Sequence, residues 1–280
     1  MFGAHVERVT VDMRKDELAS AFWRIVQIEE LLSDRHRLWS GEFDESTLDV
    51  VFTRSGIWVV LKWRSGASVA FRTAFSPGSL TVKKCSVEDD ALLIDADTPI
   101  GRQVCEIETS GDDGVFRFRT MVLPRAYLTF EAWSRDVVPL AAGSQAIGQV
   151  HTTDDEHRAG QLHASVDDGG SFLYVQELSS LSAFCGATRA SLAHTVGGDW
   201  PDIGFVPPRG RKALSPSDGP TVLTHAHVAW KSNRPADPGE AVEDQLAMLA
   251  AIYLDAGRRQ PRGDVHSPDL WNGQRPRHHR

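Results

Sequence analysis

Eight short runs of residues between Leu48 and Trp133 have the composition and the period of β-strands. Apolar and β-branched side chains recur in them, and turn-forming pairs such as Pro77-Gly78 separate the runs. The runs are LDVVFT, IWVVLKW, ASVAFRTA, SLTVKKCSV, ALLIDA, RQVCEIET, GVFRFRTMV and AYLTFEAW. Strands at this spacing build antiparallel sheets that stack into a sandwich or close into a barrel. In GVFRFRTMV, Phe116 and Phe118 share one face while Arg117 and Arg119 share the other, so we expect one dry face and one wet face.

Two helices are expected to flank the strands. From Lys15 to about Ser33 the apolar residues follow a helical stripe, with acidic residues near its positive end. Asp237-Pro238-Gly239-Glu240 suits a helix start, because the Asp can cap, the Pro occupies the first turn and the Glu can close a capping box. The stripes are Leu18, Phe22, Ile25, Val26, Leu31 and Leu32 in the first helix, and Val242, Leu246, Leu249, Ala250 and Tyr253 in the second. We expect the second helix to lie on the sandwich.

The expected fold is mainly β, a supersandwich-like antiparallel β-sandwich with an N-terminal and a C-terminal amphipathic helix. Further strands are predicted over residues 147–151, 161–164, 172–175 and 221–230. Residues 1–256 should form a single domain, which a chain of 280 residues is long enough to build. Residues 257–280, rich in Arg and Pro, should form a disordered tail or a truncated linker.

Composition limits the function classes. A formal charge of −8 argues against a nucleic-acid-binding protein, which carries a basic face for phosphates. The sequence lacks a run of about 18 apolar residues for a membrane span and an apolar secretory core at its start, so we expect a cytoplasmic protein. Cys85, Cys105 and Cys185 are widely spaced and suggest small buried side chains rather than disulfides or a zinc site. No cofactor is expected, because the P-loop and the dinucleotide glycine fingerprint are both missing.

The most unusual stretch runs from Ser171 to Pro208, where a strand passes into a helical run and then a loop rich in Gly, Pro and Trp. Gly197-Gly198 allow backbone angles that other residues avoid, and Pro201 restricts its own. Trp200 and Phe205 place large apolar rings on a segment that would otherwise be solvated. We therefore expect this loop to be packed at the edge of the sheets.

Polar residues in and near this loop are candidates for binding. An indole face matches the apolar face of a sugar ring and carboxylates accept from its hydroxyls, so Trp200 with Asp199 and Asp202 could form a sugar platform. Anchoring of the loop is the favoured interpretation of these three residues. Arg135 and Asp136 form a charged pair in an apolar setting, which favours a structural ion pair over an interface.

Histidines offer the other candidate chemistry. His225 and His227 lie two apart on a predicted strand and share a face, as metal ligands would, but the spacing implies no third ligand. A second group lacks the spacing of a calcium loop and favours a solvated turn. That group is His151, Asp154, Asp155, Glu156, His157 and His163. We therefore predict no metal site, and the missing Gly-x-Ser-x-Gly pattern argues against that class of serine hydrolase.

Several segments resemble the N-terminal β-sandwich part of large bacterial carbohydrate-active proteins, in which the sandwich precedes an (α/α)-barrel glycosidase domain. The segments are WSRDVVPL, IGQVH, GGSFLYVQELSSLSAFCGATRASLAHTVGGDWPDIGFVPP and LAMLAAIYL. The resemblance implies a sandwich that packs on the barrel and lends a loop to the substrate cleft, without carrying the catalytic residues. This chain departs from the pattern, because it stops soon after the last helix; it is then a detached or truncated module, and no catalytic residue can be carried over.

These observations lead to three hypotheses. The leading one is a non-catalytic, carbohydrate-associated module that docks a helical glycosidase-type domain or a glycan. Its binding residues would be Arg135, Asp136, Gln176, Asp199, Trp200 and Asp202. The alternatives are a structural interaction protein and a stand-alone enzyme, of a glycoside-hydrolase or related class, with His151, His163, His225 or His227 as acid or base. A docking module should expose an apolar patch, expected near Trp133 and Trp200, whereas an enzyme should show a deep pocket with convergent polar groups.

Overall fold

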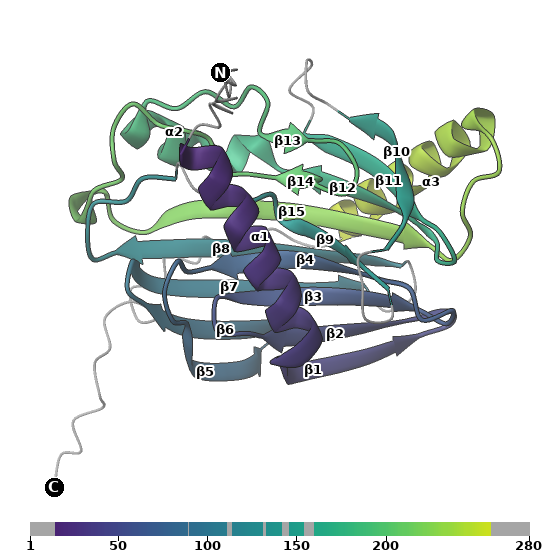
Figure 1. Cartoon of the computed structure of the whole chain (residues 1–280), viewed down its shortest axis with the longest axis horizontal. Coiled ribbons are helices and arrows are strands. Elements are labelled where there is room, and N and C mark those ends of the chain that lie inside the picture. Colours follow the sequence, from purple (N-terminus) through teal and green to yellow (C-terminus); the bar gives the residue numbers. More distant parts are fainter. Residues whose placement is uncertain are drawn as a thin grey trace, which may run out of the picture.

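Two antiparallel β-sheets pack face to face in the computed structural model of this chain, with a helix on each outer face (Figure 1). The structure describes residues 15–88, 90–110, 114–130, 133–141, 146–153 and 160–258, with the backbone alone for residues 15–20 and 153. The predicted mainly β sandwich with two flanking helices is therefore confirmed. The tail predicted over 257–280 lies outside the described residues beyond Arg258.

The smaller sheet has five strands in the order β1-β2-β3-β4-β9, and the larger has eight in the order β10-β11-β12-β15-β8-β7-β6-β5. The smaller sheet comprises β1 His36–Phe43, β2 Ser46–Phe52, β3 Gly56–Trp63, β4 Ser68–Phe75 and β9 Val137–Leu140. The larger comprises β5 Thr81–Glu88, β6 Ala91–Thr98, β7 Gly101–Ser110, β8 Val115–Pro124, β10 Gly148–Thr153, β11 Gln161–Val166, β12 Ser171–Gln176 and β15 Thr221–Lys231.

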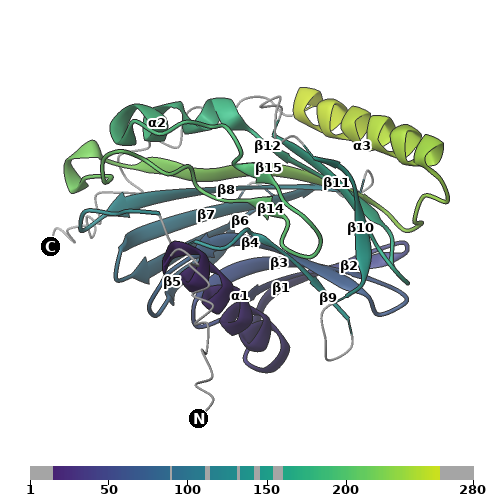
Figure 2. The ribbon, with the colours of Figure 1, turned by 45° about the horizontal axis from the view of Figure 1, so that its top comes forward.

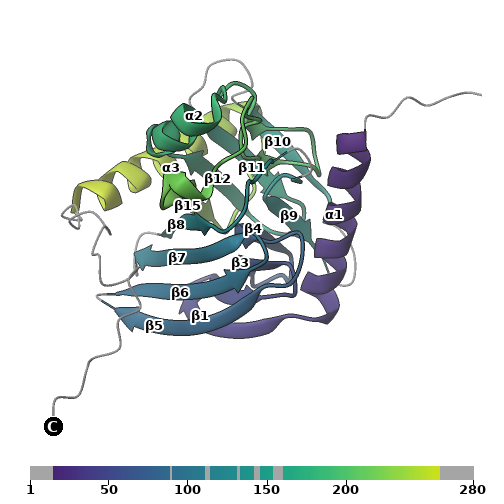
Figure 3. The ribbon, with the colours of Figure 1, turned by 90° about the vertical axis from the view of Figure 1, so that its left-hand side faces the viewer.

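Helices α1 (Lys15–Ser33) and α3 (Pro238–Arg258) lie on opposite outer faces of the sandwich (Figures 2 and 3). The shorter elements are the 3₁₀ turns η1 (Leu178–Leu181) and η2 (Pro216–Asp218), helix α2 (Ser182–Thr188) and the hairpin strands β13 (Val196–Gly197) and β14 (Gly204–Phe205). No helix in the described ranges is long and apolar enough to cross a membrane.

Seven of the eight predicted runs became strands β2 to β8, but AYLTFEAW did not. In its described part only Leu128 forms a bridge, to Leu214, since Leu128 and Phe130 turn instead toward Phe184 of α2. Strand β1 was missed because its sequence, HRLWSGEF, carries few apolar residues, in keeping with its position at a sheet edge.

The main core lies between the sheets. Phe71 of β4 contacts Phe116 of β8 and Phe172 of β12 edge-on, each with ring centroids 5.4 Å apart. Phe116 and Phe118 are fully buried, whereas Arg117 and Arg119 on the opposite face of β8 are half-buried. The predicted dry face of β8 is confirmed, whereas the opposite face is only partly exposed, because Val115 on that face is buried against α3.

Helix α1 explains why β3 is apolar on both faces. Leu31 of α1 packs with Trp58 and Val60 on the outer face of the smaller sheet. With α1 on one side and the larger sheet on the other, the run IWVVLKW is buried at every position except Lys62. A strand covered on both sides shows a continuous apolar pattern instead of alternation.

Helix α3 begins as its sequence predicts. Asp237 Oδ1 accepts hydrogen bonds from the backbone N–H groups of Gly239 at 2.7 Å and Glu240 at 3.0 Å. The Glu240 carboxylate accepts from the N–H of Ala236 at 2.7 Å. The two bonds to Asp237 satisfy donors that the first turn of a helix leaves unpaired, as predicted, whereas Glu240 bonds the residue before the cap and not the N–H of Asp237 that a capping box uses.

The three cysteines occupy different environments, and all three are thiols. Cys105 is fully buried, Cys185 is half-buried and Cys85 is exposed on β5. The prediction of buried side chains is therefore confirmed for Cys105 and wrong for Cys85, because β5 is an edge strand of the larger sheet.

Candidate functional site

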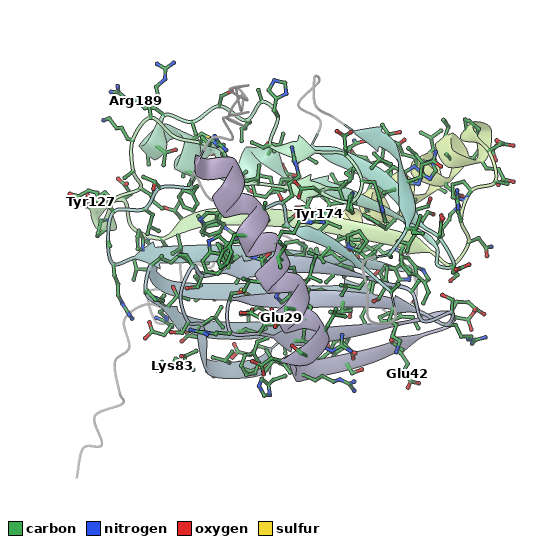
Figure 4. All side chains as sticks on the ribbon, viewed as in Figure 1. Glu29, Glu42, Lys83, Tyr127, Tyr174 and Arg189 are labelled. Carbon is green, nitrogen blue, oxygen red and sulfur yellow. The ribbon has the colours of Figure 1, made fainter. Side chains whose placement is uncertain are left out.

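The predicted binding residues converge at one edge of the sandwich, around the carboxylate of Asp136. Asp136 directly precedes β9 and is 3% exposed. Its Oδ1 accepts from the backbone N–H of Phe205 at 2.7 Å, and its Oδ2 accepts from the Tyr174 hydroxyl at 2.9 Å. This carboxylate therefore joins the β13–β14 hairpin to strand β12, and Tyr174 lies in the interior (Figure 4).

Gln176 continues this buried network. Its Oε1 accepts from Thr224 Oγ1 at 3.1 Å and lies 2.9 Å from the Tyr174 hydroxyl. Gln176 is 2% exposed. Asp136 and Gln176 are thus buried and do not offer their side chains to a ligand at the surface. They could affect binding only by fixing the position of the β13–β14 hairpin loop.

Arg72 of β4 is the main functional residue that sequence reasoning missed. It is buried, and its guanidinium donates to Gln27 Oε1 of α1 at 3.0 Å and to Ser134 Oγ at 2.8 Å. The Phe75 ring lies 4.8 Å from the guanidinium carbon, within range of a cation–π interaction. The available signal was a single charged residue, Arg72, in the otherwise uncharged run ASVAFRTA.

Burial dominates the electrostatics of this edge. Desolvation raises the pKa of Asp136 to about 6, although the positive charge of Arg72 and the hydrogen bond from Phe205 oppose the rise. Desolvation also lowers the pKa of Arg72 to about 10. Both groups are therefore mainly charged at neutral pH, and each compensates for part of the burial of the other.

Arg24 connects helix α1 to the loop. It donates to Asp202 Oδ1 at 2.9 Å, to the carbonyl of Val137 at 3.4 Å and to the carbonyl of Pro201. The Arg24 side chain is 11% exposed and that of Asp202 is 56% exposed. Asp202 therefore forms an ion pair with Arg24 of α1, while part of its side chain still faces solvent.

Two glycines permit the close approach of the hairpin. Gly204 has φ +109, and a Cβ there would lie 2.3 Å from Asp136 Oδ1. Gly198 has φ +101, and a Cβ there would lie 2.8 Å from Arg135 Nε. Arg135, which is half-buried, donates to the carbonyl of Gly204 at 2.8 Å. The hairpin can approach Arg135 and Asp136 this closely only because Gly198 and Gly204 have no side chain.

Trp200 anchors the tip of the hairpin. Its indole Nε1 donates to the carbonyl of Ala146 at 3.2 Å, and the ring covers Gly148 so closely that a Cβ there would lie 2.5 Å from it. The Trp200–Pro201 peptide bond is cis. Trp200 is half-buried and packs against the main core, while Asp199 and Asp202 are exposed. The geometry agrees with the anchoring role favoured for Trp200.

The network encloses little space. The cavity bounded by Arg72, Asp136, Phe205 and Thr224 has a volume of about 20 Å³. One water molecule needs about 10–15 Å³, so this cavity has no room for a substrate. The edge is a buried hydrogen-bond network with an exposed acidic rim formed by Asp199 and Asp202.

The four histidines considered as acids or bases form two pairs on the outer face of the larger sheet. The rings of His225 and His227 have centroids 5.4 Å apart, and those of His151 and His163 are 4.8 Å apart. Within the described residues, no three His, Cys, Asp or Glu side chains form a ready group of metal ligands. The second pair combines residues from β10 and β11, and Asp154–His157 of the predicted ligand group lie outside the described residues.

Helix α3 presents a second surface, opposite in character to the polar edge. It packs on Leu173 and Ala229 through Met248 and Ile252, which are 2% and 4% exposed. Of the predicted stripe, Leu249 also packs against this cluster, whereas Ala250 is exposed and Val242, Leu246 and Tyr253 are 56%, 61% and 69% exposed. The helix lies on the sandwich as expected, but through a face centred on Met248 and Ile252 that shares only Leu249 with the predicted stripe.

No match to this chain was found among the protein-family models, the curated proteins or the solved structures.

Proposed function

We propose that this chain is a non-catalytic, carbohydrate-associated β-sandwich module that docks a helical glycosidase-type domain through helix α3. The observation that carries the proposal is the exposed apolar surface of α3. We expected an exposed apolar patch near Trp133 and Trp200, but both tryptophans are half-buried. The proposal therefore places the docking surface on α3.

The sequence of α3 argues that this surface is covered in the functional state. Residues 246–254 read LAMLAAIYL, nine apolar residues in succession. The sheet covers the side with Met248 and Ile252, where Leu249 and Ala251 are also partly buried, whereas Leu254 on another side is 59% exposed. A helix that is apolar all round is normally buried all round, so α3 needs further neighbours.

The spacing of the exposed residues favours a helix as that neighbour. Val242, Leu246 and Tyr253 follow one another at intervals of four and seven residues, and the half-buried Leu249 lies between the last two. This is the seam of a helix that packs along another helix. Ala247 and Ala250 beside the seam are exposed and would let a partner backbone approach closely. A flat glycan would not complement such a surface.

The polar edge fits a supporting role in the same function. Arg24, Arg72 and Asp136 hold α1, β4 and the hairpin in fixed positions, and only Asp199 and Asp202 of the acidic predicted residues face outward. A fixed loop with an acidic rim could be lent to a neighbouring substrate cleft, as the resemblance implies. The small cavity behind it supports a non-catalytic role.

The test is a calorimetric titration of the full chain with the helical-barrel glycosidase domain encoded nearest to it in its genome. Binding is expected for the natural chain and should be lost in Leu246→Glu/Tyr253→Glu. Val87→Glu is the matched control, because Val87 is 65% exposed on β5, away from α3. Equal binding by the natural chain and the α3 variant, or no binding by either, would overturn the proposal.

A parallel titration against a glycan panel separates the glycan alternative. We expect no binding by the natural chain or by Trp200→Ala, since the Trp200 indole is engaged by Ala146 and Gly148. Glycan binding that Trp200→Ala abolishes, together with no binding of the helical domain, would replace domain docking by glycan recognition at the edge.

A further inference from the structure

A small groove lies on the outer face of the larger sheet and is lined by strands β5 to β8. Its volume is about 50 Å³, which is room for about four water molecules. Helix α3 packs on another part of this sheet, against β12, β15 and Val115 of β8, and no described helix lies over β5 to β7 on this face (Figure 3). The groove is therefore open to a ligand from solvent.

The floor of the groove is apolar. Val104 of β7 and Met121 of β8 stand directly opposite each other in the sheet and are 8% and 6% exposed. Neither belongs to an apolar cluster of the described residues, and Leu93 of β6, which also lines the groove, is half-buried. The long charged side chains around them, rather than a second apolar layer, keep water from this floor. Such a floor suits a ligand with a hydrocarbon part.

Three cationic and three anionic side chains line the groove, and two of the cations form ion pairs within it. Arg102 donates to both carboxylate oxygens of Asp95, at 2.8 Å and 2.9 Å. Lys84 Nζ lies 3.2 Å from Glu88 Oε1. These two cations are thus already compensated by carboxylates of the chain.

Arg119 of β8 is the third cation and has no such bond. Its Nε is buried and finds no hydrogen-bond partner among the described residues. Glu106 of β7 is the residue directly opposite in the sheet, but no hydrogen bond or ion pair joins these two described side chains, and Glu106 has contacts of its own. A buried donor without a partner costs folding free energy and is rare in native proteins. Arg119 is therefore the group in the groove that an anionic ligand would satisfy.

From this arrangement we infer that the groove binds a short-chain carboxylate, of the size of acetate to butyrate. Arg119 holds the carboxylate, and Val104 and Met121 contact the hydrocarbon chain. A guanidinium can donate two parallel hydrogen bonds to a carboxylate, and such charge-assisted bonds are stronger than neutral ones. Room for about four waters is room for a carboxylate and a few carbons, but not for a long chain.

Glu106 sets the main limit on the affinity of this site. Its carboxylate lines the same groove and repels an anion, which opposes the attraction of Arg119. Removal of this charge should therefore strengthen binding. The groove is separate from the exposed apolar side chains of α3, so this inference does not depend on the proposed docking function.

The test is a ligand-observed NMR titration of the full chain with sodium acetate, propionate, butyrate and hexanoate at constant ionic strength. The affinity should rise about fourfold with each methylene up to butyrate, which is the value of one buried CH₂ group, and no further in hexanoate. Arg119→Gln should weaken butyrate binding by about 10- to 100-fold. Arg119→Lys, which keeps the charge without the planar pair of donors, should weaken it less.

Three further variants separate a built site from nonspecific attraction. Glu106→Gln should tighten butyrate binding, and Leu93→Asn should weaken butyrate more than acetate, effects that a purely structural Arg119 would not produce. Arg64→Gln is the matched control and should bind as the natural chain does, because the Arg64 side chain is 72% exposed and lies outside the groove. Circular dichroism identifies any variant that fails to fold.

The inference is overturned by any of four results. These are no butyrate binding by the folded natural chain, unchanged binding in folded Arg119→Gln, equal binding of inorganic phosphate and butyrate, or tighter binding of alanine than of butyrate. The third result would indicate a nonspecific anion site. The fourth would indicate a site for a zwitterion, in which Glu106 binds the ammonium group.

Discussion

The Tyr174 hydroxyl donates to Asp136 Oδ2 at 2.9 Å and so joins the centre of β12 to the segment that enters β9. The other oxygen of the same carboxylate holds the N–H of Phe205 at 2.7 Å. One buried carboxylate therefore fixes the hairpin that carries Trp200. The stability of the candidate edge depends on this group.

Removal of the Tyr174 hydroxyl should destabilise the protein. Tyr174→Phe leaves a buried carboxylate oxygen without its donor, and we expect a loss of about 1–3 kcal/mol in the free energy of unfolding. Urea denaturation measures it. Tyr253→Phe is the matched control, since Tyr253 is 69% exposed, and should change the value by less than about 0.5 kcal/mol. Equal losses in the two variants would contradict this account.

A methyl group at Gly204 should loosen the hairpin. Its φ of +109 is strained for any side chain, and the new Cβ would meet Asp136 Oδ1. We expect Gly204→Ala to cost about 1–3 kcal/mol. Gly186→Ala in α2, where nothing lies within 4 Å, should instead stabilise by about 0.5–1 kcal/mol. Thermal denaturation of both variants checks the opposite signs, and a neutral Gly204→Ala would refute the close approach.

The two faces of α3 should respond differently to truncation. Met248→Ala removes a side chain buried against the sheet and should cost about 2–5 kcal/mol. Leu246→Ala on the outward face should change the free energy of unfolding by less than about 0.5 kcal/mol, because Leu246 is 61% exposed. Denaturant titrations of the isolated chain measure both values. A larger loss of stability in Leu246→Ala than in Met248→Ala would mean that α3 packs on the sheet through the predicted stripe.

Acid should weaken the fold through His163. Burial lowers the pKa of this imidazole from its ordinary value of 6.5 to about 4, so the unfolded chain takes up the proton first on acidification. Its contribution to stability is lost as the pH falls from 6.5 to 4. His163→Gln should therefore flatten the dependence of the unfolding midpoint on pH in this range. A slope equal to that of the natural chain would contradict the burial of a neutral imidazole.

Asp136 provides a control of opposite sign. Burial raises its pKa from 3.8 to about 6, so the folded protein takes up this proton first. Asp136 therefore opposes the loss of stability as the pH falls from 6 to 3.8. The same measurement on Asp136→Asn should give a steeper loss of stability on acidification than the natural chain shows.

Local features of this protein follow from neighbouring residues. Strands β2 to β8, the bounds of α1 and the start of α3 could be predicted because each depends on side chains a few positions apart. The run AYLTFEAW is an exception with a non-local cause. It has the composition of a strand, but its apolar residues find their partners in α2.

The candidate edge could not be predicted in the same way. Arg24 meets Asp202 across 178 positions and Arg72 meets Ser134 across 62, and no periodicity encodes such pairs. Asp136 and Gln176 were predicted as binding residues because charge and polarity can be read from the sequence. Their burial could not be read, since it depends on which strands and loops close over them.

The sequence by itself determined the alternation of strands, the two flanking helices and the cap at Asp237, because these depend on backbone preferences and on the period of apolar residues. Only the tertiary structure decided which apolar face of α3 meets the sheet. Nine successive apolar residues give the helix no unique inward side. The choice of Met248 and Ile252 rests on their fit to Leu173 and Ala229, and the remaining apolar side chains of α3 are left outward.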